Sequence, residues 1–268
     1  DENLKILSSV NVDQFSKIYN VNTIAIHREE LYNIINAKIK SETFFGKRLE
    51  NISFEQGNLK MSFKDGQVVE SDIIIGADGI NSNVRNSFFS KIALRAAEQL
   101  CWRGVANFKM PKYAEELNEL WGKGKRFGFV KINETQIYWY ALVNSSNYKC
   151  AALPELNDIY KAFHPDILDI INNTEESMIV ARQIQDFKTP IRWHKDGVCL
   201  IGDAAHAMTP NLGQGACQAI EDAYVLSECL QRNESLQAFT KYNEIRYKKA
   251  SSIVERSRKI GRIAQLKN

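Results

Sequence analysis

The chain has 268 residues, of which 44% are hydrophobic and 25% charged, and its formal net charge is only +3. This composition is typical of a globular protein with one large domain or two interleaved ones, and it gives no reason to expect a nucleic-acid partner. No apolar run approaches the ~20 residues that a membrane-spanning helix needs. The acidic first nine residues lack the apolar stretch of a signal peptide. We therefore expect a cytoplasmic protein, either a monomer or a homodimer.

The cysteines predict neither a disulfide framework nor a zinc site. Their number is odd, and no two of them have the C-x-x-C spacing that is common in metal sites. Reduced thiols are the expectation for such a chain, and no metal ion is predicted. The five cysteines are Cys101, Cys150, Cys199, Cys217 and Cys229.

The first part of the chain predicts a helix followed by a small sheet. From Arg28 to Lys40, four apolar residues fall on one helical stripe: Leu31, Ile34, Ile35 and Ile39. Three short runs rich in strand-forming residues follow, beginning at Thr43, Arg48 and Leu59. An Asp-Gly turn at Asp65 separates the last of them from another such run. This pattern predicts an antiparallel meander.

Two apolar runs predict strands that are covered on both faces, as in a parallel α/β sheet: Ile73–Ile75 and Val198–Ile201. Between them, residues 98–143 alternate and are rich in aromatic side chains, which indicates an antiparallel sheet with one buried face. Two short helices are expected at Glu155–Phe163 and Asp166–Ile171, and a strand is expected from Met178.

The last third of the chain predicts two helices. Asn211 and Gln214 have the spacing of a capping pair for the first helix. Its apolar residues then recur at helical intervals: Ala216, Ala219, Ile220, Ala223, Leu226 and Leu230. The longer second helix carries Phe239, Tyr242, Ile245, Ile253 and Ile260. From Lys241 onward there are nine Lys/Arg against two Asp/Glu. This basic helix could make weak contact with a membrane surface, although a solvated helix face is the plainer interpretation.

The segment from Val198 to Gly215 carries the strongest chemical signal. A buried strand ends in Gly202-Asp203, and ligands of open α/β sheets bind beyond the carboxyl ends of the strands. A carboxylate there can accept hydrogen bonds from sugar hydroxyls. Pro210 stiffens the loop, and Gly213 and Gly215 start a helix whose free N–H groups favour an anion or a carbonyl edge.

The sequence GDAAHAMTPNLGQG from Gly202, followed by Glu221-Asp222-Ala223, resembles the second FAD-binding motif of flavoprotein monooxygenases similar to para-hydroxybenzoate hydroxylase. Within that family it is similar to the branch of salicylate, urate and zeaxanthin-epoxidase-like enzymes. The resemblance implies that Asp203 binds the ribityl chain of FAD. It also implies that the turn from Gly213 through Gln214 and Gly215 to Ala216 faces the isoalloxazine ring, and that Pro210 is a further cofactor-binding residue. For His206 we expect a role in orienting the loop.

Two further segments resemble motifs of the same family. Residues 78–85 resemble its D-G-x-x-S-x-V-R motif, which is associated with FAD and with the nicotinamide cofactor. The resemblance implies a cofactor contact for Asp78, whereas Arg85 suits an anion contact and a structural salt bridge equally. An Arg followed three residues later by Leu marks an FAD-contacting position in the family, which implies that Arg28 is a cofactor ligand.

The family resemblance implies an α/β protein in which a Rossmann-like FAD-binding layer is interleaved with an antiparallel substrate-binding sheet. We expect residues 1–90 and 191–233 to form the FAD-binding domain, residues 91–190 the substrate domain, and residues 234–268 a C-terminal helix. The family's first βαβ unit, with its G-x-G-x-x-G loop, is not found. We therefore expect at least one such unit, roughly 30 residues, to be missing, and tight FAD binding by this chain alone is not expected.

The activity implied by the resemblance is an NADH- or NADPH-dependent monooxygenation. The reduced flavin would react with dioxygen, and the resulting hydroperoxide would hydroxylate or epoxidise a small aromatic or conjugated substrate. No catalytic base can be named. We expect the aromatic sheet to line the substrate pocket, with Tyr138 and Tyr140 on one face and Ile137 and Trp139 on the other. The candidate substrate-contacting residues are Trp102, Arg103, Phe129, Tyr138 and Tyr140, with Phe127 as a further candidate.

Two alternatives stay open. The first is another flavin enzyme on the same scaffold, a reductase or a halogenase, although the halogenase signature G-W-x-W-x-I-P is not found in the sequence. The second is an inactive fragment that serves as no more than a binding module. The unmatched glycine-rich unit favours this second alternative, whereas the intact segment around Asp203 favours an enzyme.

Overall fold

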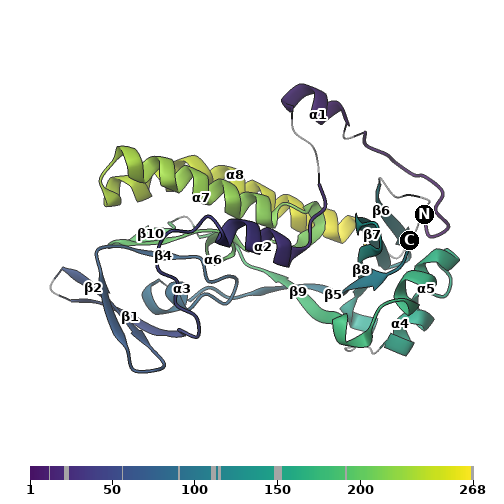
Figure 1. Ribbon diagram of the computed structural model, residues 1–268, viewed down its shortest axis with the longest axis horizontal. Helices are drawn as coiled ribbons and strands as arrows, with labels where there is room; N and C mark the ends of the chain where they lie inside the picture. The colour runs from purple at the N-terminus through teal and green to yellow at the C-terminus, as the bar shows by residue number, and fades with distance from the viewer. Residues whose placement is uncertain are drawn as a thin grey trace. The chain divides into compact units, whose positions relative to one another are not determined.

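The computed structural model describes residues 1–11, 13–20, 24–55, 57–89, 91–109, 113, 116–147, 153–190 and 192–266. The chain divides into two compact units (Figure 1). The first comprises residues 1–42, 98–183 and 264–268, and the second comprises residues 43–97 and 184–263. Mixed α/β elements, antiparallel sheets and a long C-terminal helix confirm the predicted fold class. The functional domains expected from the sequence stay a prediction.

A small sheet forms the base of the second unit. Strand β4 (Ile74–Gly76) pairs in parallel with β11 (Val198–Leu200), and β10 (His194–Lys195) pairs antiparallel with β11. The predicted parallel pair is therefore confirmed. Burial on both faces is wrong for β4, because alternation along the strand turns Ile75 away from the core and leaves it 41% exposed.

The predicted meander is confirmed in the same unit. Strands β1 (Leu49–Glu55), β2 (Asn58–Phe63) and β3 (Val68–Ser71) pair antiparallel in that order. The Asp-Gly turn joins β2 to β3, and the side chain of Asp65 accepts a hydrogen bond from the Gln67 amide. The run at Thr43 forms no strand in the described structure; Phe44 and Phe45 are 68% and 75% exposed.

Helices complete the second unit. The short helices are α3 (Asn83–Phe88), α6 (Asp203–His206) and the 3-10 turn η3 (Pro210–Leu212); the long ones are α7 (Gly215–Arg232) and α8 (Ser235–Ile263). Helices α7 and α8 run side by side (Figure 1). The predicted apolar stripe of α8 is confirmed at Phe239 and Tyr242, which are buried, but Ile245 is 58% exposed and Ile260 37%.

The predicted apolar stripe of α7 is confirmed at Leu226 and Leu230 and is wrong at Ala216, Ile220 and Ala223, which are exposed. Ile220 is 55% exposed, and the residues of α7 that are buried are Gln218, Asp222, Leu226 and Cys229. Helical spacing alone favoured a partly different face of this helix. The polar residues Gln218 and Asp222 turn inward because buried partners on α6 and α8 satisfy them.

The aromatic sheet belongs mainly to the first unit and has the strand order β6-β7-β8-β5-β9. Its strands are β6 (Leu117–Gly122), β7 (Lys125–Asn133), β8 (Gln136–Asn144), β5 (Arg95–Asn107) and β9 (Val180–Asp186). The pairs β6–β7, β7–β8 and β8–β5 are antiparallel, as predicted. Short 3-10 turns follow β8 and precede β9: η1 (Ser145–Asn147) and η2 (Glu176–Met178).

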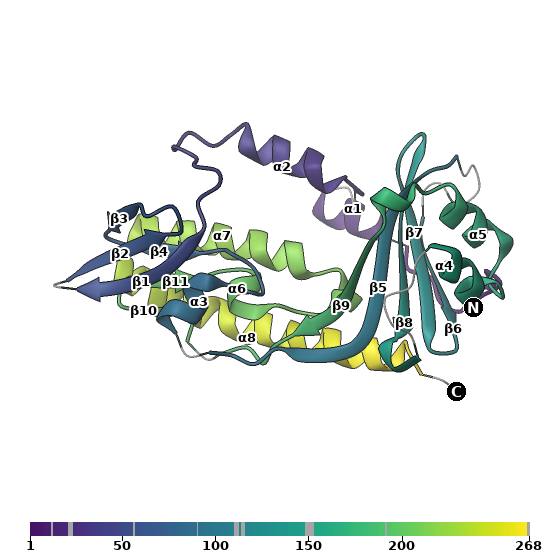
Figure 2. The same cartoon turned by 90° about the horizontal axis from the view of Figure 1, so that it is seen from below.

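Helices α4 (Leu153–Tyr160) and α5 (Pro165–Asn172) cover one face of this sheet (Figure 2) and confirm the two predicted helices. The ring of Trp139 stacks on Phe127 at 5.4 Å, and its Nε1 donates to Thr174 Oγ1 at 2.8 Å. The hydroxyl of Tyr160 donates to carbonyls of β7 and β8. These hydrogen bonds satisfy the buried polar atoms of the aromatic core, which lies on the sheet face that α4 and α5 cover.

Two helices precede the sheets in the chain, α1 (Asp13–Tyr19) and α2 (Arg28–Asn36). Helix α2 confirms the helix predicted from Arg28, although it ends earlier. Its apolar stripe is not buried: Ile34, Ile35 and Ile39 are 57%, 51% and 48% exposed.

Candidate flavin site

The loop after β11 has a backbone conformation that depends on glycine. Gly202 has φ +57° and ψ −141°, a backbone conformation that residues with a Cβ atom rarely adopt. This turn places Asp203 as the first residue of α6, with its side chain exposed. Ala204, Ala205 and His206 are buried behind it. The loop therefore presents one carboxylate at the carboxyl end of a buried strand.

The start of α7 is open to an approaching ligand. A Cβ atom added to Gly213 would meet nothing within 4 Å, and one added to Gly215 would meet only the Met208 side chain, at 3.9 Å. Gln214 precedes the helix without a capping hydrogen bond from its side chain in the described structure. The first N–H groups of a helix lack intrahelical acceptors, so the edge of a ligand with carbonyl groups can bind there.

The predicted capping pair of Asn211 and Gln214 is wrong. Helix α7 begins only at Gly215, and Asn211 lies in η3. The Asn211 amide donates instead to Thr209 Oγ1 at 2.9 Å and to the Ser257 carbonyl at 3.1 Å. Asn211 therefore ties the loop to α8, a contact that local spacing could not reveal.

The second motif segment contacts the first. Asp78 is exposed and accepts a hydrogen bond from the Val84 amide at the start of α3. The guanidinium of Arg85 is buried and donates to the Ala204 carbonyl at 2.9 Å and to the Ile80 carbonyl at 2.6 Å. Burial lowers the pKa of this guanidinium. Of the two interpretations of Arg85, these contacts favour the structural one.

Replacing Arg85 with lysine should lower the free energy of unfolding by about 1–3 kcal/mol, because one ammonium cannot serve both carbonyls and a buried acceptor loses its donor. Urea unfolding measures this change. Arg232, which is exposed on α7, provides the control: its change to lysine should alter stability by less than about 0.5 kcal/mol. A loss of FAD affinity without loss of stability would instead identify Arg85 as an anion ligand.

A buried charged network lies behind the loop. Asp222 Oδ2 accepts from the Gly202 amide at 2.8 Å and from His206 Nε2 at 2.6 Å, while Oδ1 accepts from Arg246 Nε at 2.8 Å. All three side chains are at most 1% exposed. Burial opposes ionisation of Asp222, but these hydrogen bonds outweigh it and hold the carboxyl pKa below its ordinary value.

The structure separates the candidate substrate residues onto two faces of the aromatic sheet. Trp102 and Phe129 are 1% and 2% exposed and lie in the core under α4 and α5, so they offer no surface to a substrate. Phe127 is in the same core. Arg103, Tyr138 and Tyr140 lie on the opposite face, where Arg103 is exposed and the tyrosines are half-buried. A substrate contact therefore stays a prediction for these three residues, which lie on the open face.

Hydrogen bonds order this second face. The Tyr140 hydroxyl donates to Glu119 Oε2 at 2.6 Å, and Trp121 Nε1 donates to the other carboxylate oxygen at 2.5 Å. The ring of Tyr140 crosses β7 at Gly128, where any Cβ would lie 2.1 Å from it. Burial and the Glu119 charge raise the pKa of Tyr140, so this phenol is a hydrogen-bond donor and not a base at neutral pH.

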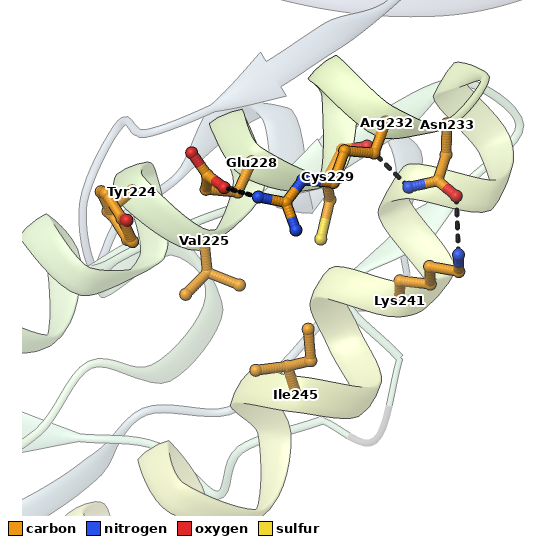
Figure 3. A pocket seen from close by; sticks show the side chains of 8 residues that line it. All are labelled: Tyr224, Val225, Glu228, Cys229, Arg232, Asn233, Lys241 and Ile245. Carbon is orange, nitrogen blue, oxygen red and sulfur yellow. Dashed lines mark hydrogen bonds and ion pairs between the residues drawn. The ribbon is translucent and has the colours of Figure 1, made fainter.

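A surface pocket of about 400 Å³ lies between α7 and α8 (Figure 3). Its apolar floor contains Val225 and Ile245, and its rim carries the ion pair of Glu228 with Arg232 and the hydrogen bond from Lys241 to Asn233. None of the predicted site residues lines it.

Arg28 begins α2 and is exposed. It belongs to the first compact unit, whereas Asp78, Asp203 and the start of α7 belong to the second. Its role as a flavin ligand stays a prediction.

Comparison with known proteins identifies the family. A family model described as "FAD binding domain" matches residues 36–257. The aurachin C monooxygenase/isomerase of Stigmatella aurantiaca is 34% identical over 98% of this chain and 70% of its own length. The 2-heptyl-3-hydroxy-4(1H)-quinolone synthase of Pseudomonas aeruginosa is 33% identical over 90% of this chain and 65% of its own length. The chain belongs to the FAD-binding monooxygenase family.

Solved structures of this family share the fold. A variant of Klebsiella pneumoniae HpxO complexed with FAD aligns with a TM-score of 0.87 at 22% identity, over 95% of this chain and 69% of that one. HpxO complexed with FAD and uric acid aligns with a TM-score of 0.82 at 24% identity, over 89% and 63% of the two chains. This chain thus spans about two thirds of the length of these relatives.

The residues of this family member fit the flavin. Open space beside Gly213 and Gly215 lets a planar, carbonyl-bearing edge reach the α7 N–H groups, and the exposed Asp203 provides an acceptor for hydroxyl groups. Two contacts of the candidate residues and their surroundings were missed from sequence. No local sequence pattern indicated a contact for Glu119, because only the register of the strands brings it to Tyr140. Asp222 lies within the recognised motif, but its role depends on Arg246 from another helix.

Proposed function

We propose that this chain is part of an FAD-dependent, NADH- or NADPH-using monooxygenase that inserts one oxygen atom into a small aromatic or conjugated substrate. The geometry of the Gly202–Asp203 loop against the open start of α7 is the observation that supports the proposal most directly. The FAD-binding family and its hydroxylase and epoxidase relatives support the same reaction class.

In this proposal the second unit holds the flavin half of FAD. Asp203 accepts hydrogen bonds from ribityl hydroxyls, and the N–H groups from Gly215 onward bind the pyrimidine edge of the ring. The positive end of α7 stabilises negative charge on that edge. Asp78 and Arg28 are further proposed cofactor contacts, the latter through guanidinium hydrogen bonds to flavin or phosphate oxygens.

FAD, when bound, supplies electron transfer from the nicotinamide and activation of dioxygen. The chain's own residues bind and orient the substrate. On the open face of the aromatic sheet, the side chain of Arg103 can bind a substrate oxygen, and the protonated hydroxyl of Tyr138 can donate a hydrogen bond. The Tyr140 hydroxyl, whose proton is donated to Glu119, offers an acceptor oxygen. Aromatic side chains on the same face provide a planar surface for stacking.

A 2-alkyl-4(1H)-quinolone is the substrate type that we propose to test first. The Pseudomonas aeruginosa relative is named as the synthase of a 3-hydroxylated alkylquinolone. Such a molecule has one carbonyl oxygen on a flat bicyclic ring. Arg103 offers a cationic donor to that oxygen and Tyr138 a hydroxyl donor, beside the aromatic surface of Tyr138 and Tyr140. A simple phenol serves as the comparison substrate.

Dioxygen uptake tests this function. The chain is incubated with FAD, NADH or NADPH, and either substrate, and products are examined by mass spectrometry. We expect substrate-dependent dioxygen uptake and a product that is heavier by one oxygen atom. Uptake with peroxide release but no oxygenated product would refute the substrate class. No substrate-dependent dioxygen uptake at saturating FAD would refute the proposal for this chain and would favour a binding module.

A further inference from the structure

Three donors from three elements converge on one buried carboxylate. The Gly202 amide from the loop and His206 Nε2 from α6 share Asp222 Oδ2, and Arg246 Nε from α8 binds Asp222 Oδ1. Arg246 is itself held by Gln218, whose Oε1 accepts from Nη2 at 2.8 Å, and by an ion pair with Glu221. The network therefore connects α7 and α8 to the residue that precedes Asp203.

The surroundings of the network exclude water. Asp222 and His206 are at most 1% exposed. The ring of Trp193 packs 5.2 Å from the His206 ring and 5.7 Å from the Tyr242 ring. In such a low-dielectric environment each charge-assisted hydrogen bond is strong, and each unpaired donor is costly. The position of Gly202 is therefore sensitive to the ionised state of Asp222.

The other end of the loop has separate anchors. The Ser257 hydroxyl donates to the Thr209 carbonyl at 2.5 Å. The Asn211 side chain packs against Gly261, since a Cβ added to Gly261 would lie 2.2 Å from Asn211 Nδ2. These anchors do not involve Asp222. Loss of the Asp222 carboxylate should therefore release the Gly202 end of the loop while η3 stays in place.

We propose that Asp222, oriented by Arg246, is a positioning residue that fixes Gly202 and His206 and thereby sets the direction of Asp203 toward the flavin. This inference rests on the proposed function for the identity of the ligand. The orientation of the loop by Asp222 can be tested without any ligand.

Asparagine at position 222 is the informative substitution. Donors face both oxygens of Asp222, two at Oδ2 and one at Oδ1, but an asparagine has only one acceptor oxygen. Whichever way its amide turns, an NH₂ group faces either the Gly202 amide or the Arg246 guanidinium. Shape is preserved, so the change removes the hydrogen bonding and the charge without leaving a cavity.

Asp186 provides the matched control in the same unit. Its carboxylate is also 0% exposed and is bound by Arg95 and Arg258. The hydrogen bonds of these two arginines in the described structure go to Asp186, Glu255 and the carbonyls of Phe187 and Ala96, and not to Gly202 or His206. Asp222→Asn and Asp186→Asn are compared in the full chain by urea unfolding, by hydrogen exchange of the backbone amides, and by titration with FAD monitored by flavin fluorescence.

We expect exchange at residues 202–206 to be faster by at least ~10-fold in Asp222→Asn than in Asp186→Asn, and FAD affinity to fall by at least ~10-fold only in Asp222→Asn. Equal exchange at this loop in the two variants would overturn the positioning role. If the unmodified chain binds no FAD, the proposed function fails, but the exchange comparison still decides the role of Asp222.

Arg246→Lys is the second variant if Asp222→Asn does not fold. Lysine keeps the positive charge beside Asp222 but loses the donor to Gln218, so Asp222 is held less firmly. We expect the loop amides of this variant to exchange faster than those of the unmodified chain, by up to ~10-fold. Unchanged protection of the Gly202 amide would overturn the proposal.

Discussion

Replacing Asp203 with alanine should lower FAD affinity by roughly 10- to 100-fold, because a hydrogen bond to a charged acceptor contributes about 1.5–3 kcal/mol and about 1.4 kcal/mol corresponds to a factor of ten in binding. Asp203 is exposed at the start of α6, so its removal leaves no cavity in the core. Stability in the absence of flavin should therefore change little. Titration with FAD and urea unfolding of the apo-protein measure the two quantities.

Asp72→Ala is the control for Asp203→Ala. Asp72 is an exposed carboxylate in the same unit, just before β4. Its replacement removes the same charge from the unit, so any long-range electrostatic effect on FAD should be shared by the two variants. Equal affinity of the two variants for FAD would refute the role assigned to Asp203.

Replacing Gly202 with alanine should destabilise the protein and disturb the site together. Its φ of +57° with ψ of −141° costs a residue with a Cβ about 1–3 kcal/mol. The new Cβ would also lie 3.2 Å from Ala219 Cβ on α7. We expect the free energy of unfolding to fall by that amount and the melting temperature by about 2–4 °C for each kcal/mol. FAD affinity should fall as well, because the loop moves away from α7.

Gly66→Ala separates backbone strain from damage to the site. Gly66 also has positive φ, at +84°, but lies in the turn between β2 and β3 and has open space around it. This variant should lose stability without losing FAD affinity. Comparable loss of FAD affinity in both glycine variants would show that global stability, and not the geometry of the loop, controls flavin binding.

Local patterns predicted much of the fold because the features concerned are short-range. Neighbouring residues determine where each strand and turn forms. This holds for the Asp-Gly turn, the strands of the meander, the buried strands at Ile74 and Val198, and the alternating aromatic strands. The recognised motif also correctly predicted a loop and helix after Asp203. In contrast, the apolar spacing in α7 predicted the buried face only in part, because Leu226 is buried but Ile220 is exposed.

The faces of α7 and of the aromatic sheet were decided by contacts between residues distant in sequence. Asp222 turns inward because Arg246, 24 residues further along the chain, neutralises it there and His206 is hydrogen-bonded to it. Trp102 and Phe129 turn toward α4 and α5, whereas Tyr140 turns toward Glu119 on β6. The alternation of residue types along a strand shows that the sheet has two different faces, but only packing determines which face is buried.

The sequence by itself determined the family, the loop that carries Asp203, the parallel strand pair and the antiparallel sheets, since these depend on residue identity and spacing. It did not predict β10, which pairs antiparallel with β11. Tertiary structure alone decided that Arg85 binds the Ala204 carbonyl and that Asp222 holds Gly202. A buried donor or acceptor must find a partner, and which partner it finds depends on how elements far apart in the chain pack together.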